Sequence, residues 1–159
     1  MADNMTIEQR SMTMSRIRGR DTKVELAVRR ELHRRGYRFR VNATWLAGKP
    51  DVVFTRIKLA VFVDGDFWHG WKFEHWGDKL APYWREKIAG NMARDRRHAA
   101  ALRAEGWAVM RIWEHDVEKT LQRSITRIEK RIAQLRETGS LLACPTSAPP
   151  ARRSSPPAQ

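Results

Sequence analysis

Apolar and polar positions follow two different periods along the chain, and the period changes several times. Apolar residues recur every three to four positions within residues 22–35, 83–105 and 121–135, the spacing that puts them on one face of an α-helix. Short β-rich runs at residues 37–41, 51–55, 59–63 and 107–113 favour strands, the last of them buried. The order α-β-β-β-α-β-α predicts an α/β fold in which helices flank a mixed sheet.

The predicted helices carry start and stop signals at their ends. Gly36 and Gly106 directly follow the first two helical patterns, and glycine commonly ends a helix in this position. Thr22 precedes the first pattern, and Glu25 stands three residues later. This spacing is the signature of a capping box, in which side chains satisfy free N–H groups of the first turn. We therefore expect the first helix to begin just after Thr22.

The composition changes sharply near the end of the chain. Residues 138–159 contain five of the seven prolines, many Ser and Ala residues, and no acidic or aromatic residue. Such a segment cannot bury enough apolar surface to offset the entropy that ordering would cost. We predict a basic N-terminal arm over residues 1–20, one folded domain over 21–137, and a disordered tail over 138–159.

The charge of the chain indicates its partner. Its 31 Lys and Arg residues against 18 Asp and Glu residues give a net charge of +13, which favours a polyanion such as nucleic acid. An anionic membrane surface is the competing partner, but it requires a basic helix with a rich apolar face, and here acids interleave with the bases. The chain has no apolar run long enough to span a membrane and no N-terminal apolar segment typical of a secretory signal. We expect a cytoplasmic protein, nucleoid-associated if prokaryotic.

Two predicted neighbouring strands have acidic residues at their ends. Asp51 follows Pro50 at the start of one strand, and Asp64 ends the next. Acids placed in this way can converge on a hard divalent cation, because Mg²⁺ prefers oxygen ligands. With the strong positive charge, the pattern indicates metal-assisted phosphodiester hydrolysis. The alternative interpretation of Asp51 is a carboxylate that only caps a turn.

A dense group of aromatic residues follows Asp66, in the sequence Phe67-Trp68-His69-Gly70-Trp71. A solvent-facing loop with so many aromatic side chains indicates a binding surface. His69 is a candidate general base, since the ordinary pKa of histidine lies near neutral. The alternative is a structural histidine that packs beside aromatic rings.

Five segments in this order resemble the very short patch repair (Vsr) DNA mismatch endonuclease family. They are RSMTMSRIRGRDTKVE, GKPDVVF, VFVDGDFWHG, YWREKIAGNMARDRR and GWAVMRIWEH, and they extend over about residues 10–115. The resemblance implies a restriction-endonuclease-like fold of the PD-(D/E)xK type. It also implies a Mg²⁺-dependent hydrolase that nicks one strand of double-stranded DNA beside a T:G mismatch, with two metal ions during catalysis.

The resemblance further implies roles for individual residues. Asp51 matches the family's metal-binding aspartate, and Val63 falls where a residue ligates metal through its backbone carbonyl. His69 matches the catalytic histidine. Glu25 matches an acid near the site, with capping of its helix as an equal alternative. The family's segments that contact DNA correspond to Met14 in the arm, to an aromatic wedge of Phe67, Trp68 and Trp84, and to Lys87, Asn91 and Arg94.

The chain departs from the family at two places. Asp66 and His115 stand where the family has cysteines of a structural zinc site, and the single cysteine, Cys144, lies in the tail. We therefore expect no structural zinc and apolar packing instead, by Trp71, Phe73 and Trp76. Asp64 replaces a family histidine and is a candidate metal ligand and catalytic acid.

The sequence leaves two alternatives to a mismatch-specific enzyme open. The first is a related DNA nickase without mismatch preference, for example one used in defence against foreign DNA. The second is a catalytically inactive DNA-binding module. A monomer is the expected state, and the sequence identifies no protein partner.

Overall fold

The structure, a computed structural model, describes residues 21–142, so Met14, the basic arm and most of the predicted tail lie outside the described residues. The helices and strands in chain order are α2 (Lys23–Arg34), β1 (Arg40–Val41), β2 (Val52–Phe54), β3 (Leu59–Asp64), α3 (Phe73–Trp76), α4 (Pro82–Ala104), β4 (Ala108–Trp113) and α5 (Glu114–Leu142). Short 3₁₀ turns, η1 (Thr55–Ile57) and η2 (Gly77–Lys79), follow β2 and α3.

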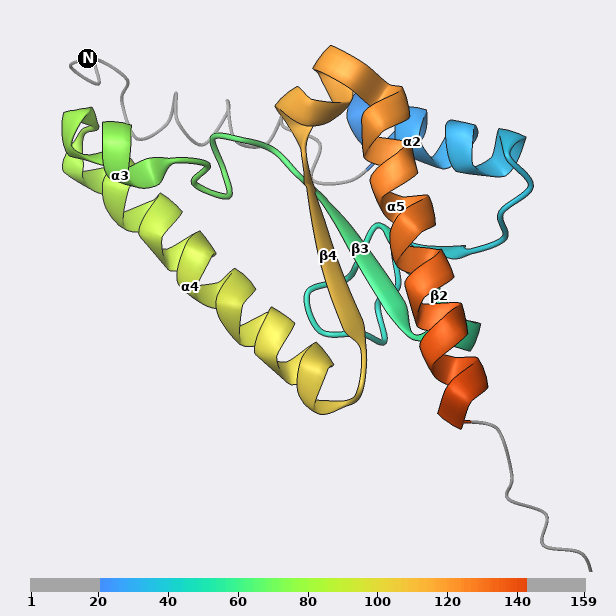
Figure 1. Ribbon diagram of the computed structural model, residues 1–159. Helices are drawn as coiled ribbons and strands as arrows, with labels where there is room; N and C mark the ends of the chain where they lie inside the picture. Colours follow the sequence, from blue (N-terminus) through green and yellow to red (C-terminus); the bar gives the residue numbers. More distant parts are fainter. Residues whose placement is uncertain (1–20, 143–159) are drawn as a thin grey trace, which may run out of the picture.

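The strands form one mixed sheet in the order β1-β2-β3-β4. The first two pairs are antiparallel, whereas β3 and β4 run parallel with Leu59 opposite Ala108 and Asp64 opposite Trp113. A parallel pair needs a long crossover connection, which α4 provides. Figure 1 shows α4 on one side of the sheet and α5 with α2 on the other. The predicted α/β fold with a mixed sheet between helices is confirmed.

Alternation along β3 divides the interior into two apolar layers. Leu59 and Val61 face the layer that contains α2 and α5, while Ala60 and Phe62 face the layer on the side of α4. Each fully buried aliphatic side chain contributes about 1.5–3 kcal/mol relative to an exposed one. A shift of β3 by one residue would exchange the two faces, so this pattern fixes the strand register.

Several predicted boundaries differ from the structure. The strand expected at residues 37–41 is reduced to β1, because Tyr37 and Phe39 pack against the α2–α5 layer instead of pairing with β2. The last strand was expected to be buried, but only Ile112 of β4 is fully buried, since β4 lies at the edge of the sheet.

The last helix is longer than its apolar pattern predicted. It begins at Glu114, continues through a kink at Thr120 and reaches Leu142. The predicted domain boundary after Glu137 therefore falls inside α5. In the described part of the chain, no helix combines the length and hydropathy that crossing a membrane requires.

Candidate active site

Asp51 lies immediately before β2 and is tied to the neighbouring strand. Its backbone N–H donates to the Val61 carbonyl at 3.0 Å, and its carboxylate Oδ2 accepts from the Val63 N–H at 2.7 Å. Burial raises the pKa of Asp51 from its ordinary 3.8 to about 7, against the lowering effect of the Val63 hydrogen bond, and the nearby Glu25 charge raises it further. A carboxylate in this environment gains from a cation beside it.

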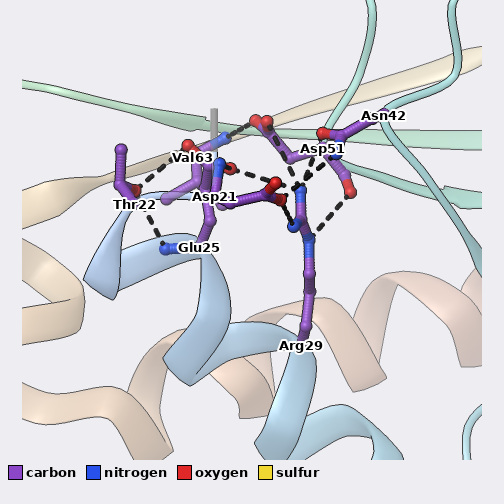
Figure 2. A network of polar contacts seen from close by, with 7 residues as sticks. All are labelled: Asp21, Thr22, Glu25, Arg29, Asn42, Asp51 and Val63. Atoms are coloured by element: carbon purple, nitrogen blue, oxygen red, sulfur yellow. Dashed lines mark hydrogen bonds and ion pairs between the residues drawn. The ribbon is translucent and has the colours of Figure 1, made fainter. Parts of the chain in front are cut away.

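Arg29 links Asp51 to other acidic groups (Figure 2). Its Nη1 lies 2.5 Å from Asp21 Oδ1, and its Nη2 lies 3.2 Å from Glu25 Oε2 and 4.0 Å from Asp51 Oδ1. Asn42 Oδ1 accepts a further hydrogen bond from Nη2 at 2.9 Å. Three carboxylates therefore share one guanidinium, so this group of side chains carries an excess of negative charge.

Glu25 participates in the helix cap that the sequence predicted. Its backbone N–H donates to Thr22 Oγ1 at 3.3 Å, and the Thr22 hydroxyl donates to Glu25 Oε1 at 3.0 Å. Glu25 Oε2 accepts the Asp21 N–H at 2.8 Å as well as the Arg29 guanidinium. The capping interpretation is confirmed, and the same side chain connects the start of α2 to Asp51 through Arg29.

A second polar network surrounds His69. His69 Nδ1 lies 2.6 Å from Asp95 Oδ2 on α4 and 3.6 Å from Asp64 Oδ1 at the end of β3. Arg111 Nη1 on β4 donates to Asp64 Oδ2 at 2.7 Å and lies 3.4 Å from Asp95 Oδ2. Arg111 is opposite Phe62 in the sheet register and stacks over its ring, so it reaches Asp64 along the α4 face of the sheet.

This network shifts three pKa values. Burial alone would lower the pKa of His69, but the Asp95 hydrogen bond and the Asp64 charge outweigh it, and the net shift is upward. Burial raises the pKa of Asp64 against the opposing charges of His69 and Arg111. Burial also opposes ionisation of Asp95, yet the His69 hydrogen bond lowers its pKa overall. With a carboxylate at Nδ1, the Nδ1–H tautomer is favoured, which leaves Nε2 as the basic nitrogen.

Asp64 is more enclosed than the sequence indicated. It is 2% exposed, and its oxygens face Arg111 and His69. Among residues 21–142, no three His, Cys, Asp or Glu side chains form a group that could hold a metal ion by themselves. A hard cation at Asp51 would therefore complete its coordination with waters and backbone oxygens, as Mg²⁺ commonly does.

One cavity of about 590 Å³, the active-site cavity, joins the two networks. Asp51 and Val63 line it from the sheet, and His69 lines it from the loop after β3. The other predicted residues that line it are Glu25, Asp64, Trp68, Lys87, Asn91 and Arg94. The structure therefore brings together most of the residues predicted for catalysis and DNA contact, from four separate segments of the chain.

The predicted wedge residues form an aromatic cluster beside this cavity. Phe67 stacks on Trp76 with ring centroids 5.6 Å apart, and Trp68 meets Trp84 edge-on at 5.9 Å. Phe67 also contacts Trp68 and Trp84, and it is 40% exposed. Trp84 is half-buried in this cluster, so it does not belong to the fully buried core. We refer to Phe67, Trp68, Trp76 and Trp84 as the aromatic cluster.

Asp66 and His115, which the sequence placed at the expected zinc positions, interact with each other. His115 Nδ1 lies 2.7 Å from Asp66 Oδ1, and its ring lies 4.4 Å from that of Trp71. The Trp76 indole N–H donates to the Trp71 carbonyl at 2.8 Å, and Phe73 packs edge-on against Trp76 at 5.3 Å. These contacts supply the aromatic packing that was expected in this segment, while the predicted absence of zinc stays a prediction.

Besides Asp21 and Asn42, three residues of the networks were missed in the sequence, although each of the three carried a local signal. Asp95 lies one helical turn after Asn91 and two after Lys87, which places it on the same face of α4. Arg111 is the one charged residue in the apolar run of β4. Arg29 lies one turn after Glu25 on α2. Their partners are distant in sequence, so only the fold shows the networks they form.

Comparisons with known proteins agree with these features. Residues 2–75 match the family described as DNA mismatch endonuclease Vsr. The type II nicking enzyme V.XorIIP of Xanthomonas oryzae pv. oryzae is 43% identical over 116 residues, which cover 72% of this chain and 85% of that protein. The type II nicking enzyme V.NmeDIP of Neisseria meningitidis serogroup C is 41% identical over 123 residues, covering 74% and 81%. The DNA mismatch endonuclease Vsr of Escherichia coli is 36% identical over 117 residues, covering 72% and 74%. The chain therefore belongs to the Vsr family, and it is a DNA nicking endonuclease with that family's restriction-endonuclease-like fold.

Proposed function

We propose that this nicking endonuclease cuts one strand of duplex DNA beside a T:G mismatch in a Mg²⁺-dependent reaction. The observation that carries the proposal is one cavity that both Asp51 and His69 line, beside the aromatic cluster. A relative 36% identical to the chain is named as a DNA mismatch endonuclease. The basic residues Lys87 and Arg94 line the same cavity, where they can contact phosphates.

The acidic side of the cavity fits a hard divalent cation. Endonucleases of this family are generally metal-dependent. The Asp51 carboxylate is enclosed beside Glu25, and its pKa of about 7 reflects burial without a full counter-charge. We propose that Asp51 and the Val63 backbone carbonyl hold Mg²⁺, which when bound would polarise the scissile phosphate and activate water. Asp64 would stay with Arg111 and act through His69.

His69 supplies the base in this proposal. Asp95 holds the Nδ1 side of the ring, so Nε2 is available to accept a proton from the attacking water. Asp95 acts through His69 and is therefore a positioning residue. Glu25 and Arg29 in turn fix the position of Asp51 from α2.

Asn91 links the catalytic and recognition sides of the cavity. Its Nδ2 donates to the Trp68 carbonyl at 3.1 Å, and its Oδ1 accepts from Arg94 at 3.1 Å. It is therefore held in place rather than solvated. The aromatic cluster next to it can enter the base stack, because prying apart a base step costs a few kcal/mol, less at a mismatch, and stacking offsets part of that cost.

Strand-specific nicking of labelled T:G and T:A duplexes, with Mg²⁺ or EDTA, tests the proposal. We expect nicking of the T strand only, at the mismatch, and no product in EDTA. Phe67→Ala should reduce the ratio of T:G to T:A nicking about tenfold, since stacking on one aromatic ring is worth about 1–3 kcal/mol. Because Phe67 is 40% exposed but packs against three rings, this variant should lose a few degrees of melting temperature and remain folded.

Two other results of this assay would favour the alternative functions. Equal nicking of the two duplexes would favour a nickase without mismatch preference; the names of the type II nicking relatives mention nicking but no mismatch. Tight binding without cleavage under all metal conditions would contradict the enzymatic proposal and leave a DNA-binding module.

A further inference from the structure

The loop between β1 and β2, residues 43–50, presents a tryptophan to solvent. Trp45 is 60% exposed, more than any other exposed large apolar side chain in the described part of the protein. A single exposed apolar residue needs no explanation by itself. The significance of Trp45 comes from the rigidity of its loop and from the position of that loop beside the active-site cavity.

Backbone hydrogen bonds and buried neighbours fix this loop. The Ala43 N–H donates to the Pro50 carbonyl at 3.2 Å and closes the loop, while Leu46 and Lys49 N–H groups donate to the carbonyls of Ala43 and Leu46 at 3.2 and 3.1 Å. Ala43 and Leu46, on either side of Trp45, are buried in the apolar layer that faces α4. The indole is therefore held outward by anchors before and after it.

Gly48 attaches the same loop directly to α4. It has a φ of +75°, and a Cβ at this position would lie 3.0 Å from His98 Nδ1 and 3.2 Å from the Phe62 ring. Only glycine allows both this backbone conformation and this close approach. The loop is thus placed against α4 at His98, one turn beyond Arg94.

A second cavity, of about 380 Å³, extends the active-site cavity toward Trp45. Thr44 and Leu46, the two neighbours of Trp45, line it together with His98. It shares Lys49, His69 and other residues with the active-site cavity. The continuous depression follows α4 from the aromatic cluster, past the His69–Asp95 pair, to the loop.

The length of this path corresponds to a substantial part of a DNA binding site. From Trp84 to His98, α4 rises about 21 Å at 1.5 Å per residue. A distance of about 20 Å corresponds to roughly six base pairs at 3.4 Å each. Loop 43–50 therefore lies on the far side of the His69–Asp95 pair from the aromatic cluster.

We propose that loop 43–50 is a second DNA-contacting element, which grips the flank of the duplex on the side of the scissile phosphate away from the aromatic cluster. Trp45 packs on a sugar or base of that flank, and Lys49, which is exposed and lines both cavities, contacts an adjacent phosphate. This inference rests on the proposed function, because it takes the duplex to lie along α4. The contact makes affinity depend on the length and sequence of one flank.

Duplexes of decreasing flank length test the inference with the full-length protein. On a T:G duplex of three helical turns in EDTA, Trp45→Ala should raise the Kd about tenfold, in line with the measured contribution of aromatic stacking, and Trp45→Phe should restore most of the affinity. When the contacted flank is shortened to two base pairs, wild type and Trp45→Ala should bind equally. Lys49→Ala should show the same dependence on flank length. Its matched control, Lys130→Ala on α5, removes the same charge from the opposite side of the sheet and should not.

Direct contact is checked by photocrosslinking. A 5-iodouracil placed in turn at each position of the flank should give a crosslinked peptide that contains Trp45, and Trp45→Phe should reduce its yield. A Kd that rises equally on full and shortened duplexes, or does not rise, would overturn the inference, as would crosslinks confined to the aromatic cluster. These results are separable from the proposed function, because loss of mismatch preference would equalise T:G and T:A nicking without removing the dependence of Trp45→Ala on flank length.

Discussion

Asp51→Asn should reduce the single-turnover rate of nicking at least about 1000-fold and leave DNA affinity intact or slightly improved. The reduction corresponds to roughly 4 kcal/mol of transition-state stabilisation. The substitution removes the carboxylate charge that would hold the metal but keeps a side chain of the same size. Affinity should not fall, because the lost charge is one that repels the phosphates of DNA. The rate is measured with saturating enzyme and Mg²⁺, and the Kd by fluorescence anisotropy in EDTA.

Asp116→Asn is the matched control for this prediction. It removes the same charge from a half-exposed position on α5, where Asp116 pairs with Arg127 and lies 3.4 Å from His115 Nε2. We expect wild-type nicking and binding from this variant. Nicking by Asp51→Asn within about tenfold of the wild-type rate would reject Asp51 as the principal metal ligand, since loss of a metal site costs far more.

The same substitution should stabilise the metal-free protein at pH 8 but not near pH 4. The pKa of Asp51 is about 7 in the fold and has an ordinary value of 3.8, so between these values the folded state binds a proton that the unfolded state has lost. Stability therefore falls as pH rises through this window, by roughly 2–4 kcal/mol for this group. Urea unfolding in EDTA should show the difference between Asp51→Asn and wild type growing by this amount from pH 4 to pH 8. A difference independent of pH would contradict the prediction.

The sequence predicted the layers of the fold well because they depend on local periodicity. The apolar repeats in α2, α4 and α5 and the β-rich runs of β2 and β3 each record which face of an element is buried. The end of α5 was predicted less well, since residues 136–140 contain none of the apolar residues that mark a buried face. The exposure of β4 was also missed, because an apolar strand has the same pattern at the edge of a sheet as in its centre.

Candidate site residues such as Asp51 and His69 could be named from the sequence because their residue type suits the chemistry and their order along the chain suits the motif; the structure places both in one cavity. Their partners could not be named, because an ion pair depends on which distant elements the fold brings together. Arg111 is separated from Asp64 by a whole crossover helix, and only the parallel pairing of β3 with β4 brings them within 2.7 Å. Likewise, Trp45 carries no motif. Its proposed contact with DNA is argued from the close approach of Gly48 to His98 on α4, which the sequence does not reveal.

His69→Ala should lower the single-turnover rate about 1000-fold without raising the Kd for DNA. General base catalysis contributes typically 10²–10⁴-fold, and among residues 21–142 no other imidazole lines the active-site cavity. His98 lies on α4 and lines the neighbouring cavity, so it provides the matched control. His98→Ala should retain most of the rate, and an equal loss in both variants would indicate that the His69 effect is a general disturbance of the packing between α4 and the loop after β3.

The pH–rate profile of Asp95→Asn tests whether Asp95 raises the pKa of a catalytic His69 or only supports the local packing. The Asp95 hydrogen bond and the Asp64 charge raise the pKa of His69 against the effect of burial. Because the base must be neutral, the rate should fall as pH drops through this raised pKa. Removing the Asp95 charge lowers the pKa of His69, so the acid limb of the pH–rate profile should move to lower pH while the plateau drops about 10- to 100-fold. A purely structural Asp95 would lower the rate equally at every pH, and that result would remove Asp95 from the role of positioning the base.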